Sequence, residues 1–146
     1  MVSAGECSLP SVPPTRHPRT HPSTVLVVED DRAIRYLFTE VLRNAGYEVI
    51  ACEDGAVGLA MARDRIHTIH AVVTDSTMPG LDGREMVAAI RSLSPQMPIL
   101  IVSGSVDHIR EGAVRDSQDP HILYLCKPIS PERLTVELKN LLASLV

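Results

Sequence analysis

Acidic, hydroxyl and amino side chains follow short apolar runs of the sequence, and together they could bind and transfer a phosphoryl group. The triplet Glu29-Asp30-Asp31 follows one short apolar run, and Asp75 ends a second. Ser103 and Lys127 end two more. Clustered carboxylates repel one another and need a cation, and oxygen ligands suit Mg²⁺ or Mn²⁺. A lysine and a hydroxyl beside it would donate to an anion, and an aspartate can form an acyl phosphate. The set therefore fits phosphoryl transfer to a carboxylate.

Each of these residues also has an ordinary structural explanation. Asp30 or Asp31 could cap a helix, and Asp75 could start a turn, because a Pro-Gly pair follows it. Ser103 could cap the next helix, and a single lysine such as Lys127 is most often a solvated charge. Separate explanations do not say why all these groups end apolar runs, so the phosphoryl site is the stronger hypothesis.

The segments between these residues alternate between strand-like and helix-like patterns. Val25–Val28 is a β-branched apolar run, typical of a strand buried on both faces. Apolar residues then recur at helical spacing from Ile34 to Leu42, and Gly46 suits the position after a helix. The same alternation predicts strands at 47–51, 71–74, 99–102 and 122–125, and helices from near 54, from 82, over 106–115 and from 130.

Helix-start patterns support two of these helices. Asp82 with Glu85 forms a capping box, and Ser130-Pro131 supplies an N-cap and a first-turn proline. The last helix carries an apolar stripe of Leu134, Leu138, Leu141, Leu142 and Leu145. Five strands alternating with five helices predict an α/β fold, doubly wound as (βα)5, with a parallel sheet between two helical layers. In such sheets the functional site lies at the carboxyl ends of the strands.

Composition indicates one globular domain. The 146 residues are 45% hydrophobic and 22% charged, which is ordinary for such a domain. A net charge of −4 disfavours nucleic acid as a partner, and no apolar run is long enough for a membrane span. The three widely spaced cysteines suggest neither a disulfide framework nor a zinc site, so we expect a cytoplasmic protein.

Residues 1–23 differ in composition from the rest of the chain. They are rich in proline, with serine, threonine and histidine between the prolines. Such a segment cannot bury enough apolar surface to offset its ordering entropy, so we expect a disordered tail before a folded domain at 24–146. His17 and His21 are weak evidence for a metal site on that tail.

Several short motifs, in this order, closely resemble those of response-regulator receiver domains of two-component signalling. They are Val27-Val28-Glu29-Asp30-Asp31, Thr74-Asp75-Ser76-Thr77-Met78-Pro79-Gly80, Asp82-Gly83, Ile101-Val102-Ser103-Gly104 and Cys126-Lys127-Pro128. The resemblance covers about residues 24–145, and the spacing of the motifs also agrees. It implies a flavodoxin-like, CheY-like fold with strand order 2-1-3-4-5.

The resemblance implies a metal site and a phosphoacceptor. Asp75 is expected to accept the phosphoryl group. Glu29 and Asp30 are expected to be the acidic pair that holds Mg²⁺ together with Asp75, and the backbone carbonyl of Thr77 is expected to add a ligand. Asp31, a third acid beside the pair, is expected to cap the first helix.

The resemblance also implies a switch. Ser103 is expected to be the hydroxyl that turns toward the phosphoryl group, and Lys127 the cation that pairs with a phosphoryl oxygen, with a cis bond to Pro128. Tyr124 matches an aromatic switch position, although simple core packing is an alternative. Ser103 stands where threonine is commoner in this family, and Gly104 stands where alanine is frequent.

These roles lead to an expected function and to alternatives. We expect a stand-alone receiver domain that takes its phosphoryl group from a histidine kinase or a histidine phosphotransfer protein and then switches a surface for a downstream protein. It could instead be a module of a larger hybrid kinase or phosphorelay. A phosphatase of the haloacid-dehalogenase type is a remote alternative, because that class needs a second aspartate where Thr77 stands. We therefore expect a signalling domain that acts only on its own phosphoryl group.

Overall fold

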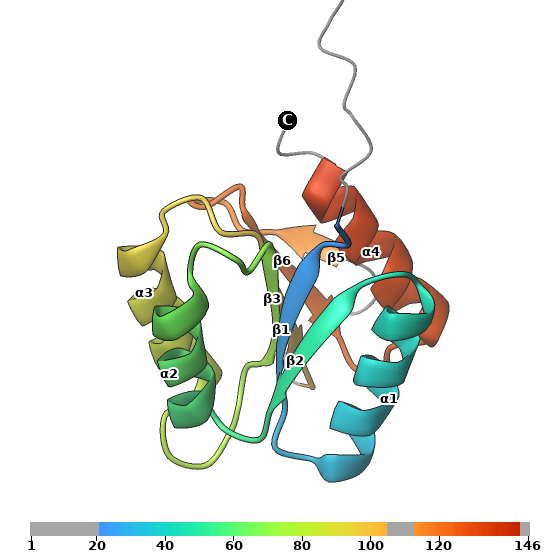
Figure 1. Ribbon diagram of the computed structural model, residues 1–146, viewed down its shortest axis with the longest axis horizontal. Helices are drawn as coiled ribbons and strands as arrows, with labels where there is room; N and C mark the ends of the chain where they lie inside the picture. Colours follow the sequence, from blue (N-terminus) through green and yellow to red (C-terminus); the bar gives the residue numbers. More distant parts are fainter. Residues whose placement is uncertain (1–20, 105–112, 144–146) are drawn as a thin grey trace, which may run out of the picture.

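The computed structural model describes residues 21–104 and 113–143 (Figure 1). The predicted tail therefore lies almost entirely outside the described residues, as does Leu145 of the last predicted helix. In chain order the described elements are β1 (Thr24–Val28), α1 (Arg32–Asn44), β2 (Glu48–Cys52), α2 (Gly55–Arg65), β3 (Ala71–Asp75), α3 (Gly83–Leu93), β4 (Ile99–Ser103), β5 (Ala113–Arg115), β6 (Ile122–Cys126) and α4 (Pro131–Ala143).

One sheet organises these elements, in the order β2-β1-β3-β4-β6-β5. The first five strands in that order pair in parallel, and β5 pairs antiparallel with β6. Figure 1 shows α1 and α4 on one side of the sheet and α2 and α3 on the other. The predicted doubly wound fold and the order 2-1-3-4-5 are confirmed, with β6 as the fifth predicted strand.

Two apolar cores fill the space between the sheet and its helices. Alternate residues of each strand enter opposite cores: Leu26 and Val28 face α2 and α3, whereas Val25 and Val27 face α1 and α4. β3 and β4 are buried along their whole length. Such strands have no solvent-facing side, so polar groups placed at their carboxyl ends are held on a rigid support.

Capping side chains fix where the helices begin. Asp31 accepts a hydrogen bond from Ile34 N at 3.0 Å, so the predicted cap of the first helix is confirmed. Asp82 accepts from Glu85 N at 2.9 Å, and Ser130 accepts from Arg133 N at 3.1 Å. These contacts satisfy amide groups that a helix start leaves unpaired, and they set the loops that follow the strands.

The prediction of a helix over 106–115 is wrong at the residues that the structure describes. Residues 105–112 lie outside the described part of the chain, but Ala113–Arg115 forms a strand instead. Val114 pairs with Tyr124 of β6, and the sheet gains a sixth, antiparallel strand. The pairing satisfies backbone groups that would otherwise be unpaired at the edge of β6, and this outweighs a helical pattern already interrupted by Gly112.

Candidate functional site

Three carboxylates meet at the carboxyl ends of β1 and β3. Glu29, Asp30 and Asp75 each offer one oxygen, and these oxygens lie within 4.8 Å of one another. Glu29 and Asp75 are buried, whereas Asp30 is exposed. The parallel pairing of β1 with β3 brings the two strand ends side by side, so residues far apart in sequence form one acidic cluster.

Lys127 extends into this cluster from the end of β6. Its Nζ lies 3.0 Å from Asp75 Oδ2 and 3.8 Å from Glu29 Oε2. Burial alone lowers the pKa of the ammonium, but the hydrogen bond to Asp75 and the charge of Glu29 outweigh burial and raise the pKa above its ordinary value. Lys127 therefore stays charged and partly balances the acids.

Glu29 is the least satisfied group of the cluster. Burial raises the pKa of its carboxyl to about 7, against the lowering effect of the Asp31 amide, which donates to Oε1 at 3.2 Å. Oε2 is buried and has no hydrogen-bond partner among the described residues. A buried carboxylate oxygen without a hydrogen bond, in a cluster with two other acids, suits a hard divalent cation such as Mg²⁺ or Mn²⁺, so the oxygen donors fit the expected metal.

The Asp75 carboxylate is oriented through both of its oxygens. Oδ2 accepts from Lys127 Nζ, and Oδ1 accepts from Thr77 N at 3.2 Å. Gly83, the first residue of α3, approaches the Asp75 carbonyl so closely that any β-carbon there would overlap with it. The loop after β3 is thus packed tightly against the strand end and keeps this carboxylate in place.

Arg35 of α1 is a supporting residue that the sequence reasoning missed. Its Nη1 donates to the carbonyl of Glu29 at 2.8 Å and to the carbonyl of Asp30 at 3.4 Å. These bonds hold the loop that carries the acidic pair. The sequence does place an arginine in the first turn of the helix after the acids. Its contacts are to backbone atoms, however, and such contacts produce no recognisable sequence motif.

Ser103 and Tyr124, on the neighbouring strands β4 and β6, have hydrogen bonds of their own. The Ser103 hydroxyl accepts from Ser76 Oγ at 2.8 Å, and the backbone N–H of Lys127 donates to the Ser103 carbonyl at 2.8 Å. The Tyr124 hydroxyl donates to Asp116 Oδ2 at 2.9 Å. Burial and then this hydrogen bond raise the pKa of Tyr124. The structure thus brings Glu29, Asp30, Asp75 and Lys127 together, with Ser103 at the next strand end.

The predicted cis peptide bond between Lys127 and Pro128 is confirmed. It directs the chain out of β6 toward α4 directly after the lysine. Lys127 also lines a cavity of about 450 Å³, together with Ile34, Leu37, Phe38, Gly104, Pro128 and Ile129. The lysine is therefore shared between the charged pocket and a mostly apolar groove.

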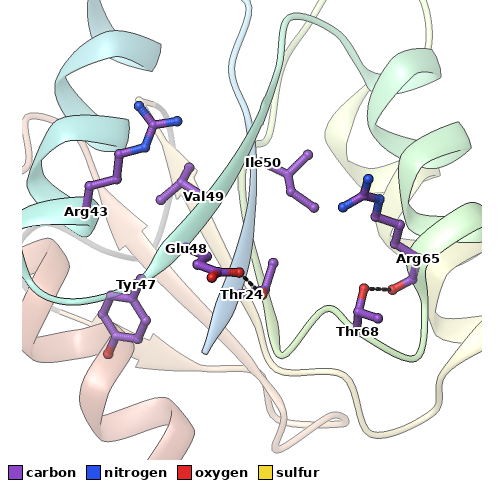
Figure 2. Close-up of a pocket in the computed structure, with 8 residues that line it drawn as sticks. All are labelled: Thr24, Arg43, Tyr47, Glu48, Val49, Ile50, Arg65 and Thr68. Atoms are coloured by element: carbon purple, nitrogen blue, oxygen red, sulfur yellow. Dashed lines mark hydrogen bonds between the residues drawn. The ribbon is translucent and has the colours of Figure 1, made fainter. Parts of the chain in front are cut away.

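A second cavity lies at the opposite ends of the strands. It measures about 610 Å³ and is lined by Thr24, Arg43, Tyr47, Glu48, Val49, Ile50, Arg65 and Thr68. Figure 2 shows Arg43 and Arg65 on opposite sides of β2, with Glu48 directed to Thr24. Because its two cations do not converge, this cavity lacks the cluster of charges found at the carboxyl ends.

Comparison with known proteins decides to which family this arrangement belongs. The family model described as the response regulator receiver domain matches residues 25–139. The chain belongs to the response-regulator receiver family. The acids, the lysine and the Ser103 hydroxyl lie at the strand ends that the motifs of the receiver domain predicted from the sequence.

Curated relatives of this receiver domain are longer proteins. Response regulator MprA of Mycolicibacterium vanbaalenii is 37% identical over 124 residues, and response regulator protein FleR of Pseudomonas aeruginosa is 34% identical over 113 residues. The matches cover 83% and 75% of this chain but 51% and 22% of those proteins. The chain therefore spans about half the length of MprA and less than a quarter of FleR.

Solved receiver structures resemble this receiver domain along nearly their whole length. The receiver domain of the hybrid histidine kinase CckA has a TM-score of 0.70 at 29% identity, covering 82% of this chain and 99% of that one. The chemotaxis response regulator CheY4 of Vibrio cholerae has a TM-score of 0.68 at 30% identity, covering 82% and 98%. Among the described helices, none combines the length and apolar character needed to cross a membrane.

Proposed function

We propose that Asp75 of this receiver domain accepts a phosphoryl group from the phosphohistidine of a histidine kinase or a histidine phosphotransfer protein, in a reaction that depends on Mg²⁺ or Mn²⁺. The observation that carries the proposal is the position of the Asp75 carboxylate, 3.0 Å from the Lys127 ammonium and within 4.8 Å of two further acids. A carboxylate so placed has a cation to balance an incoming phosphate and two acids to hold a metal.

The transfer exchanges one bond for another. An Asp75 oxygen attacks the phosphorus in line, the P–O bond forms, and the P–N bond to the donor imidazole breaks with its electron pair left on nitrogen. Lys127 stabilises the charge on the phosphoryl oxygens. Glu29, Asp30, Asp75 and the carbonyl of Thr77 would hold the metal, which when bound supplies further charge balance. Thr77 N, which donates to Asp75 Oδ1, helps to keep the attacking carboxylate in position.

The output is a change in a protein-binding surface. Ser103 would turn toward the new phosphoryl group, and Tyr124 would respond on the neighbouring strand, since both lie on the β4–β6 side of the sheet. The two conformations differ in population rather than in fold, and phosphorylation biases the balance between them. A downstream protein would then read the surface around β6.

The setting of this reaction follows from the same chemistry. Cys52 and Cys126 are free thiols, which suits the cytoplasm, where a histidine kinase presents its phosphohistidine. The partners would be proteins rather than nucleic acid or membrane. A stand-alone receiver and a receiver within a larger hybrid kinase share this chemistry. The mass of the native protein, detected with an antibody against the receiver domain, distinguishes the two arrangements.

Phosphoramidate, a small donor with the same P–N bond, tests the proposal. We expect the wild-type chain to gain a phosphoryl group in the presence of Mg²⁺ and to gain none in EDTA. Asp75→Asn should gain none in either condition, while Asp64→Asn, which changes an exposed acid of α2, should match the wild type. Equal labelling of Asp75→Asn would contradict the proposal. Steady turnover of p-nitrophenyl phosphate would favour a phosphatase instead.

A further inference from the structure

We propose that the Ser76 hydroxyl is a latch that holds the Ser103 hydroxyl in a resting position until Asp75 carries a phosphoryl group. The proposal rests on the proposed function, because it concerns the regulation of that same site. Ser76 Oγ donates to Ser103 Oγ at 2.8 Å, across 27 positions of sequence. Ser103 is buried, so its hydroxyl depends on protein partners for hydrogen bonds.

The register of the sheet brings these two hydroxyls together. Asp75 pairs with Val102 in the parallel ladder, so Ser76, the first residue after β3, comes beside Ser103, the last residue of β4. Ser76 N also donates to Val102 O at 3.1 Å, which extends the ladder past the end of β3. The position of Ser76 opposite Ser103 is therefore fixed by a backbone hydrogen bond to β4 at the point where the chain leaves β3.

The same alternation shows which side of the sheet the latch holds. Side chains alternate along a strand, so Ser76 is directed to the face opposite that of Asp75. Ser103 follows the alternation of Ile101, which packs with Tyr124 in the core beneath α2 and α3. The hydrogen bond thus keeps Ser103 on the same face of the sheet as Tyr124. The acceptor carboxylate follows the side chains of the other face.

A serine at position 103 needs a hydrogen bond to hold its hydroxyl in one rotamer. Threonine is stiff about χ1 because its Cβ is branched, whereas a serine hydroxyl can occupy all three staggered positions. Gly104 follows and adds backbone freedom instead of removing it. The bond from Ser76 selects one rotamer that the side chain alone would not fix.

Phosphorylation would release the latch through a stronger acceptor. The bond between the serines joins two neutral groups, whereas a phosphoryl oxygen is charged, and charge-assisted hydrogen bonds are about twice as strong. Ser103 would exchange its hydrogen bond with Ser76 for one with the phosphoryl group. The free energy of the lost Ser76–Ser103 bond opposes the switch. Removing the Ser76 hydroxyl removes that opposition, which raises the population of the competent state and the apparent affinity for a phosphoryl mimic.

Titration with beryllium fluoride in the presence of Mg²⁺ tests the latch by NMR. We expect Ser76→Ala to bind this mimic about threefold to tenfold more tightly than the wild type, the range for one neutral hydrogen bond. Its Tyr124 ring and Ser103 amide signals, recorded without the mimic, should already be shifted toward their positions in the bound wild type. A side chain with a merely structural role would not shift the signals in that direction.

Matched variants separate the latch from general effects. Ser76→Thr keeps the hydroxyl and should behave as the wild type, whereas Ser76→Cys, a weak donor of nearly the same shape, should shift in the direction of Ser76→Ala. Ser92→Ala removes an exposed serine hydroxyl of α3 and should change nothing. Unchanged or weaker binding by Ser76→Ala, beside a wild type that responds, overturns the latch alone. A wild type that shows no response at Asp75 overturns the proposed function as well.

Discussion

Two groups of polar side chains differ in how their hydrogen-bonding groups are paired. One is the acidic pocket at the carboxyl ends of β1 and β3, and the other is the switch side, formed by Ser103 of β4, Tyr124 of β6 and their partners. In the acidic pocket, three carboxylates share one lysine, and Glu29 Oε2 is buried without a hydrogen-bond partner among the described residues. On the switch side, Ser76 pairs with Ser103, and Tyr124 pairs with Asp116. The pocket is charged and incompletely satisfied, whereas the switch side is formed by close hydrogen bonds.

This difference indicates how the work is divided between the two groups. The pocket has its residues in position before any ligand binds, so binding a cation relieves repulsion that the fold already contains and prepares the pocket for the negatively charged phosphoryl group. The switch side is held in one arrangement, so it responds only by exchanging hydrogen bonds. We therefore expect pocket variants to change binding and chemistry strongly, and switch variants to change populations by smaller factors.

Lys127→Met should produce the largest effect. Loss of the ammonium that faces Asp75 removes a group that would stabilise the phosphoryl oxygens, so the initial rate of phosphorylation by phosphoramidate should fall by about 100-fold. Affinity for Mg²⁺ should rise in the same variant, because a competing cation is gone. Lys139→Met, an exposed lysine of α4, is the control. A fall in both quantities would show that Lys127 supports the fold of the pocket rather than the chemistry.

Asp30→Asn should weaken Mg²⁺ binding by about tenfold or more, because a charged oxygen ligand becomes a neutral one. Asp30 is exposed, so the melting temperature in EDTA should stay within about 2 °C of that of the wild type. The neighbouring variant Asp31→Asn keeps a good helix cap and should leave both quantities unchanged. Titration of Mg²⁺ by calorimetry measures the difference. Equal effects of the two variants on Mg²⁺ affinity would contradict the assignment of Asp30, rather than Asp31, as a metal ligand.

Asp116→Asn should have the smallest effect. Its Oδ1 accepts from the amides of Gln118 and Asp119, and its Oδ2 accepts from Tyr124. An amide group in place of Oδ2 keeps the turn and removes the acceptor of the tyrosine. The free energy of unfolding should fall by about 1 kcal/mol, the net value of one hydrogen bond. Denaturant unfolding measures the loss, and a loss several times larger would show that the turn itself has collapsed.

The pKa shifts of Asp116 and Tyr124 predict the pH range in which this loss of stability can be measured. Hydrogen bonding from the Gln118 amide is the main cause that lowers the pKa of Asp116 from 3.8, so its contribution is present above that value and is lost as the pH falls through the lowered pKa. Burial raises the pKa of Tyr124 from 10.0, so its contribution is present below that value and is lost as the pH rises through the raised pKa. The stability difference between wild type and Asp116→Asn should therefore be constant from about pH 5 to about pH 9. A slope within that range would contradict the assignment.

Much of the pocket was predictable because its residues end buried strands. Apolar runs locate β1, β3, β4 and β6, and parallel strands place their carboxyl ends on one edge. Caps such as Asp31, Asp82 and Ser130 were predictable because capping is a local interaction over three residues. The predicted strand at 47–51 is displaced by one residue from β2, which is an ordinary uncertainty at strand ends.

The switch side was less predictable, because its contacts join segments distant in sequence. A three-residue strand such as β5 is too short to show a periodic pattern, and its pairing with β6 is a tertiary interaction. The contact of Ser76 with Ser103 depends on the register of β3 and β4. In the acidic pocket, the contact of Arg35 with loop carbonyls depends on a side-chain rotamer. None of these leaves a local sequence pattern.

Mapping the phosphoryl group on the wild-type chain tests the acidic pocket most directly. After reaction with phosphoramidate and Mg²⁺, borohydride reduction converts an acyl phosphate into an alcohol that marks its position in a peptide mass spectrum. We expect one marked residue, Asp75, in the presence of Mg²⁺ and no marked residue in EDTA. Marking at Glu29, at Asp30 or outside the pocket, or marking that is independent of the metal, would contradict the assignment of Asp75 as the acceptor.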